Sequence, residues 1–153
     1  DGLHNWEFFV DFSGNLQIYG DGFLKGTFSV VDGAYTQISD KKLKTNINQI
    51  SNVIPSLMQL QPSTYNYKGS ESTSQKSIGF IAQDVQKLFP ELVQESNDSK
   101  GEQTLTVNYA GFGVVAIQAI KEQQEVIDAQ AQKIEDLEAR MAKLEKLIET
   151  KLK

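Results

Sequence analysis

The sequence is poor in the residues that form disulfides, bind metals or cross membranes. Its 153 residues include no cysteine and a single histidine, His4. The missing thiols exclude a disulfide framework, a thiolate nucleophile and a cysteine-based zinc site, and one isolated histidine predicts neither a metal site nor a cofactor. No stretch approaches the ~20 apolar residues of a membrane span, and the first residues lack the basic and apolar regions of a signal peptide. We therefore expect a soluble chain without membrane contact.

Positive charge is also scarce. The formal net charge is −5, and the one basic run, Lys41, Lys42 and Lys44, is short. Nucleic-acid binding depends on clustered Lys and Arg side chains that displace counterions from phosphates. We therefore expect no nucleic-acid partner.

The length of the chain allows one modest domain plus an elongated element. Its patterns predict an α+β fold in three parts. They are a β-strand segment over 1–38, a small mixed α/β domain over 39–109 and a long helix over 110–153. Because the chain begins within strand-like sequence, we expect residues 1–38 to be the end of a longer β-structured fibre or spike.

Residues 1–38 contain short aromatic and β-branched runs that are separated by Gly, Asp and Asn, which is typical of strands joined by tight turns. The expected turns are 13–15 and 21–22. Three such strands are marginally stable alone, so we expect this segment to need other chains. The runs are Trp6, Phe8, Phe9, Val10 and Phe12, then Leu16, Ile18 and Tyr19, then Phe23, Leu24, Phe28, Val30 and Val31.

The middle of the chain is expected to alternate short strands and helices. Apolar residues at steps of three and four predict a helix over 45–60. Pro55 can divide it into two short helices. A second helix is expected over 83–89, ending at Pro90. Polar composition predicts loops over 68–77 and 95–101. The expected strands cover 64–67, 78–81, 92–93 and 104–107.

The last part carries a seven-residue repeat, which is typical of a coiled coil. A helix over 110–153 would extend about 65 Å, which is longer than a small domain can cover, so we favour a coiled coil over a helix packed on its own domain. The repeat by itself leaves dimer and trimer open. Its a positions are Ile120, Ile127, Ile134, Met141 and Ile148, and its d positions are Gln123, Gln130, Leu137, Leu144 and Lys151.

A polar junction, ISDKKLKTNI, covers residues 38–47 between the strand-rich and helical parts. Taken locally, it reads as an N-capping Ser39 or Asp40 followed by solvated lysines. A serine and a lysine five residues apart are common, so the junction alone does not indicate an active site.

Three ordered blocks of sequence nonetheless resemble one family. They are SDKKLKTNI at 39–47, IGFIAQDVQKLFPELV at 78–93, and LTVNY at 105–109 followed by AIQAIK at 116–121. In this order, ending in a coiled coil, they resemble the C-terminal intramolecular chaperone auto-processing domain of phage endosialidases, tail spikes, tail fibres and neck appendages.

The resemblance implies a trimeric chaperone that is released by autoproteolysis at a Ser–Lys dyad. At the matching positions, Ser39 would be the nucleophile and Lys44 its general base. Asp40 belongs to the same motif without an assigned role, and Gln83 is a candidate oxyanion donor that supports the site. We expect cleavage between Ile38 and Ser39, because the hydroxyl can close a five-membered ring onto the preceding carbonyl. The bond after Ser39 is the second option.

The five-residue spacing constrains how this dyad can form. On a helix, Ser39 and Lys44 would lie ~140° apart, and on a strand they would point to opposite faces. The dyad therefore requires a bend in the chain or a partner chain that contributes one member. The lysine must also be neutral to accept a proton, a state that burial and neighbouring positive charge favour.

These expectations define a function. The chain would trimerise, assist folding of the upstream fibre of the same polypeptide, and then release itself. The three helices would be parallel, and the seam of the homotrimer would contain Ile120, Ile127, Ile134, Leu137, Met141, Leu144 and Ile148. Assembly is expected in the host cytoplasm, after which the fibre part joins the virion tail. The alternatives are a non-catalytic trimerisation tip retained on the mature fibre, and a receptor-binding tip that uses residues 1–38.

Overall fold

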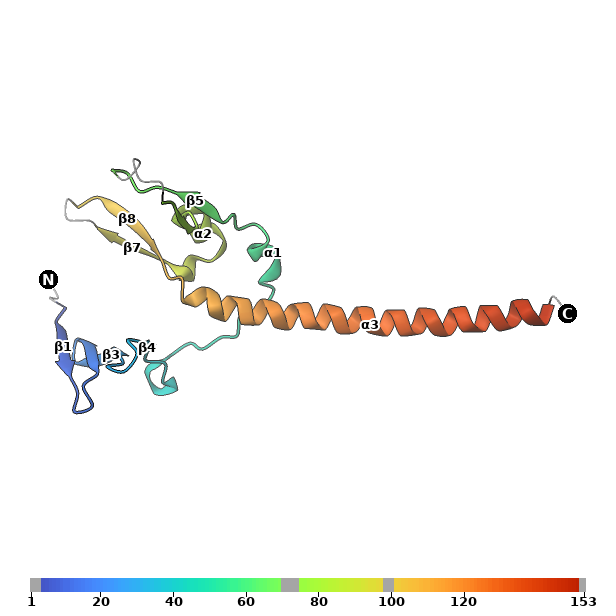
Figure 1. Ribbon diagram of the computed structural model, residues 1–153, viewed down its shortest axis with the longest axis horizontal. Helices are drawn as coiled ribbons and strands as arrows, with labels where there is room; N and C mark the ends of the chain where they lie inside the picture. Colours follow the sequence, from blue (N-terminus) through green and yellow to red (C-terminus); the bar gives the residue numbers. More distant parts are fainter. Residues whose placement is uncertain (1–3, 70–74, 98–100, 152–153) are drawn as a thin grey trace. The chain divides into compact units, whose positions relative to one another are not determined.

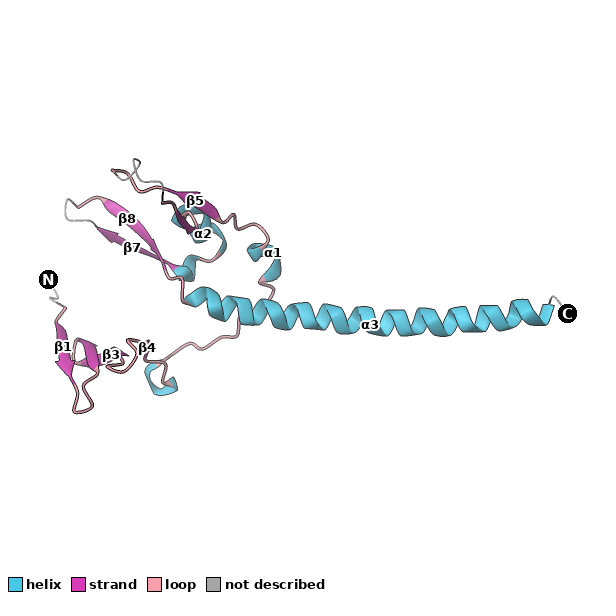
Figure 2. Ribbon diagram, viewed as in Figure 1, coloured by secondary structure: helices cyan, strands magenta, loops and turns pink. Residues whose placement is uncertain are grey.

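The computed structural model describes residues 4–69, 75–97 and 101–151. The chain forms two compact units, Asp1–Asn48 and Gln49–Lys153. Figure 2 shows that the first unit is built from strands and a short helical turn, whereas the long helix α3 belongs to the second unit. Small sheets combined with a long C-terminal helix confirm the predicted α+β class.

The first unit is a four-stranded antiparallel sheet in sequence order. Its strands are β1 (Trp6–Val10), β2 (Leu16–Gly20), β3 (Phe23–Phe28) and β4 (Tyr35–Gln37). The first three confirm the strands predicted from the aromatic runs. The short β4 was not predicted.

Tight turns join these strands where the sequence predicts them. Gly14 lies between β1 and β2 with φ +88°, and Asp21 and Gly22 lie between β2 and β3 with φ +54° and +77°. Glycine adopts positive φ without steric cost, and aspartate tolerates it better than most residues. The turns after β1 and β2 are therefore confirmed.

One face of this sheet is apolar. The register places Val10, Leu16, Phe28 and Tyr35 in one row across the four strands, so their side chains share a face. The Phe28 and Tyr35 rings contact each other with centroids 4.9 Å apart. All four side chains are largely exposed in the single chain, and the buried hydrophobic side chains of the described residues all lie in the second unit.

The helix predicted over 45–60 is wrong over most of its length. Only Ile54–Leu57 is helical, as α1. Asn46 and Asn52 adopt φ of +52° and +56°, in the left-handed region that a right-handed helix cannot include. Pro55 lies in the first turn of α1, where a missing N–H costs little.

The second unit contains two antiparallel hairpins (Figure 1). The first pairs β5 (Ser63–Tyr65) with β6 (Ser77–Gly79), and the second pairs β7 (Val93–Asn97) with β8 (Gln103–Val107). The helix α2 (Ala82–Leu88) follows β6 and confirms the helix predicted before Pro90.

The loop predicted from residue 95 is wrong at its start. Glu95, Ser96 and Asn97 continue β7 and pair with β8. Both hairpin strands expose many side chains, so polar composition does not exclude a strand there. The remaining centres of the two predicted loops, 70–74 and 98–100, lie outside the described residues.

A small core holds the second unit together. Val85 on α2 is fully buried, with 0% of its surface exposed. It packs with five further buried side chains from the segments around α1, α2 and the start of α3. They are Val53, Leu60, Phe89, Leu92 and Val115.

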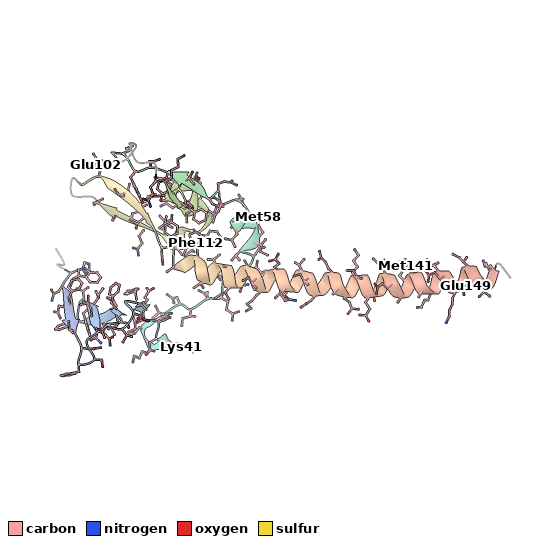
Figure 3. All side chains as sticks on the ribbon, viewed as in Figure 1. Lys41, Met58, Glu102, Phe112, Met141 and Glu149 are labelled. Atoms are coloured by element: carbon pink, nitrogen blue, oxygen red, sulfur yellow. The ribbon has the colours of Figure 1, made fainter. Side chains whose placement is uncertain are left out.

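The helix α3 spans Gly111–Lys151 and confirms the long helix predicted from the heptads. Its first turns join the core through Phe112, Val115 and Ala119. At 1.5 Å per residue, its 41 residues extend about 60 Å. Figure 3 shows Met141 on a stretch of α3 that no other element of this unit covers.

Candidate functional site

Ser39 and Lys44, the predicted nucleophile and base, meet within the first unit. Lys44 Nζ donates a hydrogen bond of 2.7 Å to Ser39 Oγ. Both side chains are exposed in the single chain. One chain alone therefore forms the contact that a Ser–Lys dyad requires.

A short 3-10 helix, η1 (Lys41–Leu43), makes this contact possible. Lys41, labelled in Figure 3, begins the turn. The Leu43 N–H donates to the Asp40 carbonyl at 3.1 Å, and the Lys44 N–H donates to the Lys41 carbonyl at 3.0 Å. These bonds reverse the chain direction and return Lys44 to Ser39, which is the bend that the five-residue spacing demands.

Asp40 is the N-cap of this turn. Its Oδ1 accepts a hydrogen bond of 2.9 Å from the Lys42 N–H, and its Oδ2 forms an ion pair of 3.1 Å with Lys42 Nζ. The junction therefore contains a capping residue followed by solvated lysines, as its local sequence predicts. It also forms the Ser39–Lys44 contact.

The residue before Ser39 is tied to the sheet. The Ile38 N–H donates to the Lys25 carbonyl on β3 at 3.2 Å, which continues the pairing of β4 by one residue. The predicted scissile bond thus joins a residue held by the sheet to a residue that leads into η1. Sequence reasoning did not identify Lys25, because its contact depends on the unpredicted β4.

A shallow pocket of about 350 Å³ lies beside this site within the first unit. Lys44 and Ile38 contribute to its wall. Apolar side chains and two charged groups complete the lining, namely Phe23, Leu24, Leu43, Lys25 and Asp40. Lys44 therefore lies next to apolar surface while the residue itself remains exposed.

Gln83, the predicted supporting residue, belongs to the second unit. It lines a cavity of about 470 Å³ together with several aromatic side chains, including Tyr65, Phe80 and Tyr109. There, a hydrogen bond with Tyr67 and then desolvation raise the pKa of Tyr65 to about 12. A role of Gln83 at Ser39 stays a prediction.

The residues predicted for the trimer seam lie along α3. Ile127 and Ile134 are 49% and 56% exposed, and the other seam side chains that are large and apolar are exposed to a similar extent. The stripe thus remains available for a partner. Its pairing with other copies stays a prediction.

Glu122 is a structurally important residue that the sequence analysis missed. Its carboxylate accepts hydrogen bonds from the Val53 N–H at 3.0 Å, the Ile54 N–H at 3.2 Å and Gln118 Nε2 at 3.1 Å. Desolvation raises the pKa of Glu122, but the hydrogen bonds from Gln118, Val53 and Ile54 outweigh it and hold the pKa below its usual range. Glu122 therefore anchors the start of α1 to α3.

Neither a metal-binding cluster nor a membrane-spanning helix occurs in the part of the chain that the structure describes. Within 4–69, 75–97 and 101–151, no group of three or more His, Asp or Glu side chains is placed to hold a metal ion. In the same ranges, no helix combines the length and apolar character of a membrane span.

Residues 39–94 match the Peptidase S74 family, described as chaperone of endosialidase. The matched segment begins at Ser39 and includes the first two of the three resembling blocks, so the resemblance is confirmed. Peptidase S74 is a family of self-cleaving peptidase domains.

Two tail fibre proteins of bacteriophages are similar to this chain. Long tail fiber protein Gp37 of Enterobacteria phage K3 is 34% identical over 86 residues, which is 54% of this chain and 7% of the relative. Long tail fiber protein Gp37 of Enterobacteria phage T2 is also 34% identical over 86 residues, or 54% of this chain and 6% of the relative. The chain therefore matches only a small part of the length of either relative.

Proposed function

We propose that this chain is an intramolecular chaperone of a viral tail fibre or spike. It trimerises, assists folding of the fibre part of the same polypeptide, and then releases itself by cutting the bond between Ile38 and Ser39. The observation that carries the proposal is the 2.7 Å hydrogen bond between Lys44 Nζ and Ser39 Oγ, at the start of the segment that matches the family. The parts are the fibre end 1–38, the chaperone domain 39–109 and the coiled coil 110–153.

In the proposed reaction, a neutral Lys44 amine takes the proton from Ser39 Oγ, and the oxygen attacks the carbonyl carbon of Ile38. The tetrahedral intermediate expels the Ser39 nitrogen, which takes the proton that Lys44 carries, and an ester remains between Ile38 and Ser39 Oγ. Water then hydrolyses this ester. The balance is one peptide bond and one water consumed, with one carboxyl group and one amine formed.

The exposure of Ser39 and Lys44 explains why self-cleavage would follow assembly of the trimer. Lys44 Nζ and Ser39 Oγ are already within hydrogen-bond distance in the single chain, but only a neutral amine can accept the serine proton. Exposure to water favours the ammonium form of any lysine, and desolvation favours the neutral amine. Because both side chains are exposed, we propose that neighbouring copies cover them in the trimer and so activate the base.

Two exposed apolar surfaces support assembly. The stripe on α3 has the seven-residue repeat of a coiled coil, and the sheet of the first unit leaves the Val10, Leu16, Phe28 and Tyr35 row uncovered. A coiled coil forms from local contacts, so it can bring three chains together first and raise the effective concentration of their fibre segments. Cutting in the host cytoplasm would then leave the fibre part for the virion tail.

The mass of the purified protein tests this proposal. The unchanged sequence should give two fragments, 1–38 and 39–153, whereas Ser39→Ala and Lys44→Ala should each give one chain of 17.1 kDa that still trimerises. Ser13→Ala, which removes an exposed hydroxyl elsewhere in the first unit, is the matched control and should be cut. A trimer of the unchanged sequence that keeps its full mass would instead favour a non-catalytic trimerisation tip.

A further inference from the structure

We propose that Asp40 is a positioning residue for self-cleavage, acting as the cap that closes the turn between Ser39 and Lys44. This inference rests on the proposed function of the Ser39–Lys44 pair. It assigns a role to a residue that touches neither reacting atom.

The geometry places Asp40 at the point where the chain changes from extended to the helical turn η1. Its φ of −65° and ψ of 131° are extended, and η1 begins at the next residue. The Oδ1 atom accepts the Lys42 N–H at 2.9 Å, a donor that has no partner within so short a helix. The Asp40 carbonyl accepts the Leu43 N–H at 3.1 Å. Asp40 thus forms two of the hydrogen bonds that start the turn.

Local bonds of this kind matter here because packing within the chain does not hold the turn. Residues 39–50 are all exposed in the single chain. A helix of three residues is also too short to be stable through its own hydrogen bonds. The cap therefore sets how often Lys44 Nζ lies within reach of Ser39 Oγ. Removing a cap of this type lowers the ratio of the capped to the open structure about 2-fold to 30-fold.

Asp40 could instead act through its charge, because Oδ2 also pairs with Lys42 Nζ at 3.1 Å. This ion pair is exposed, and exposed pairs contribute little. The two roles can be separated by chemistry. Asparagine and serine cap helices about as well as aspartate but carry no charge. Alanine carries no charge and does not cap a helix.

The experiment measures the rate of self-cleavage in trimers of the full chain. Asp40→Ala should cut about 2-fold to 30-fold more slowly than the unchanged sequence, and Asp40→Asn and Asp40→Ser should restore most of the rate. Lys42→Ala removes the ion pair but keeps the backbone N–H that Asp40 accepts, so it is the control and should cut faster than Asp40→Ala. The pH at which the rate is half-maximal should be the same in Asp40→Ala, Asp40→Asn and Asp40→Ser, because all three lack the charge and differ only in the cap.

Several results would overturn the assignment. They are unchanged cutting by Asp40→Ala, equal loss in the alanine and asparagine variants, or a pH profile that differs between Asp40→Ala and Asp40→Asn. If Asp40→Ala does not assemble, the serine variant decides, and a loss of more than 10-fold there rejects the cap. Ser39→Ala is measured alongside. Cutting of Ser39→Ala would reject the proposed dyad, whereas an uncut Ser39→Ala beside a normal Asp40→Ala would reject only the role of Asp40.

Discussion

Val114 and Val115 are neighbours in α3 with opposite surroundings. Val115 is 6% exposed and belongs to the core of the second unit, whereas Val114 is 63% exposed. Neither residue belongs to the predicted a and d positions of the coiled coil. We therefore expect Val115→Ala to destabilise the fold and Val114→Ala not to.

The expected magnitude follows from burial and helix propensity. Valine to alanine removes two methyl groups, and at ~0.8 kcal/mol per group a buried site loses about 1.6 kcal/mol, to which the cavity adds. Alanine is the better helix former by up to ~0.7 kcal/mol at either position. Val115→Ala should lower the free energy of unfolding by about 1–2 kcal/mol. Val114→Ala should leave it unchanged or raise it by up to ~0.7 kcal/mol.

Urea unfolding followed by circular dichroism measures both variants. Protein concentrations must be equal, because the stability of an assembled protein depends on concentration. The two variants should differ in free energy of unfolding by about 2 kcal/mol. This difference is the informative quantity, because both variants gain the same helix propensity and the gain cancels between them. Equal destabilisation would show that Val114 is also buried, and would refute the orientation of α3 on the core.

Three further predictions concern the dyad, the trimer and the anchor of α1. Lys44→Arg should leave the chain uncut by mass spectrometry, because a guanidinium stays protonated and cannot take the serine proton; normal cutting would eliminate Lys44 as the base. Ile127→Asp combined with Ile134→Asp should give an uncut monomer in sedimentation, since each copy would bring two charges into an apolar seam; a trimer would reject the seam. The lowered pKa of Glu122 means that its contribution to stability is present above its ordinary value of 4.5 and is lost as the pH falls through the lower folded value. Glu122→Gln should therefore lose less stability than the unchanged sequence on acidification, and equal losses in urea unfolding would argue against the anchor.

The long helix could be predicted because its signal is local and repeated. Ile120, Ile127 and Ile134 recur every seven residues, and each repeat supports the same element. The segment 45–60 has a similar spacing over a shorter length and forms mostly irregular chain. Asn46 adopts positive φ there. Asparagine tolerates the left-handed region better than most residues, so its presence in this segment is the signal that could have predicted a shorter helix.

The site could be predicted only in part. The motif indicated Ser39 and Lys44, and their spacing indicated a bend. The contact between Ile38 and Lys25 depends on pairing between β3 and β4, and β4 is only three residues long. The contact between Glu122 and Val53 joins residues 69 positions apart. Neither contact has a local pattern, because side chains meet there only after the sheet or the core has formed.

The hydrogen bond from the Ile38 N–H to the Lys25 carbonyl determines what kind of end a cut would leave. Hydrolysis after Ile38 leaves that N–H in the peptide bond to Gln37, so the last residue of the fibre part keeps its attachment to β3. The new carboxylate would therefore lie flush with the edge of the sheet. Such a cut would leave the chain ending in a residue that is still hydrogen-bonded to the sheet, and not in an unpaired tail.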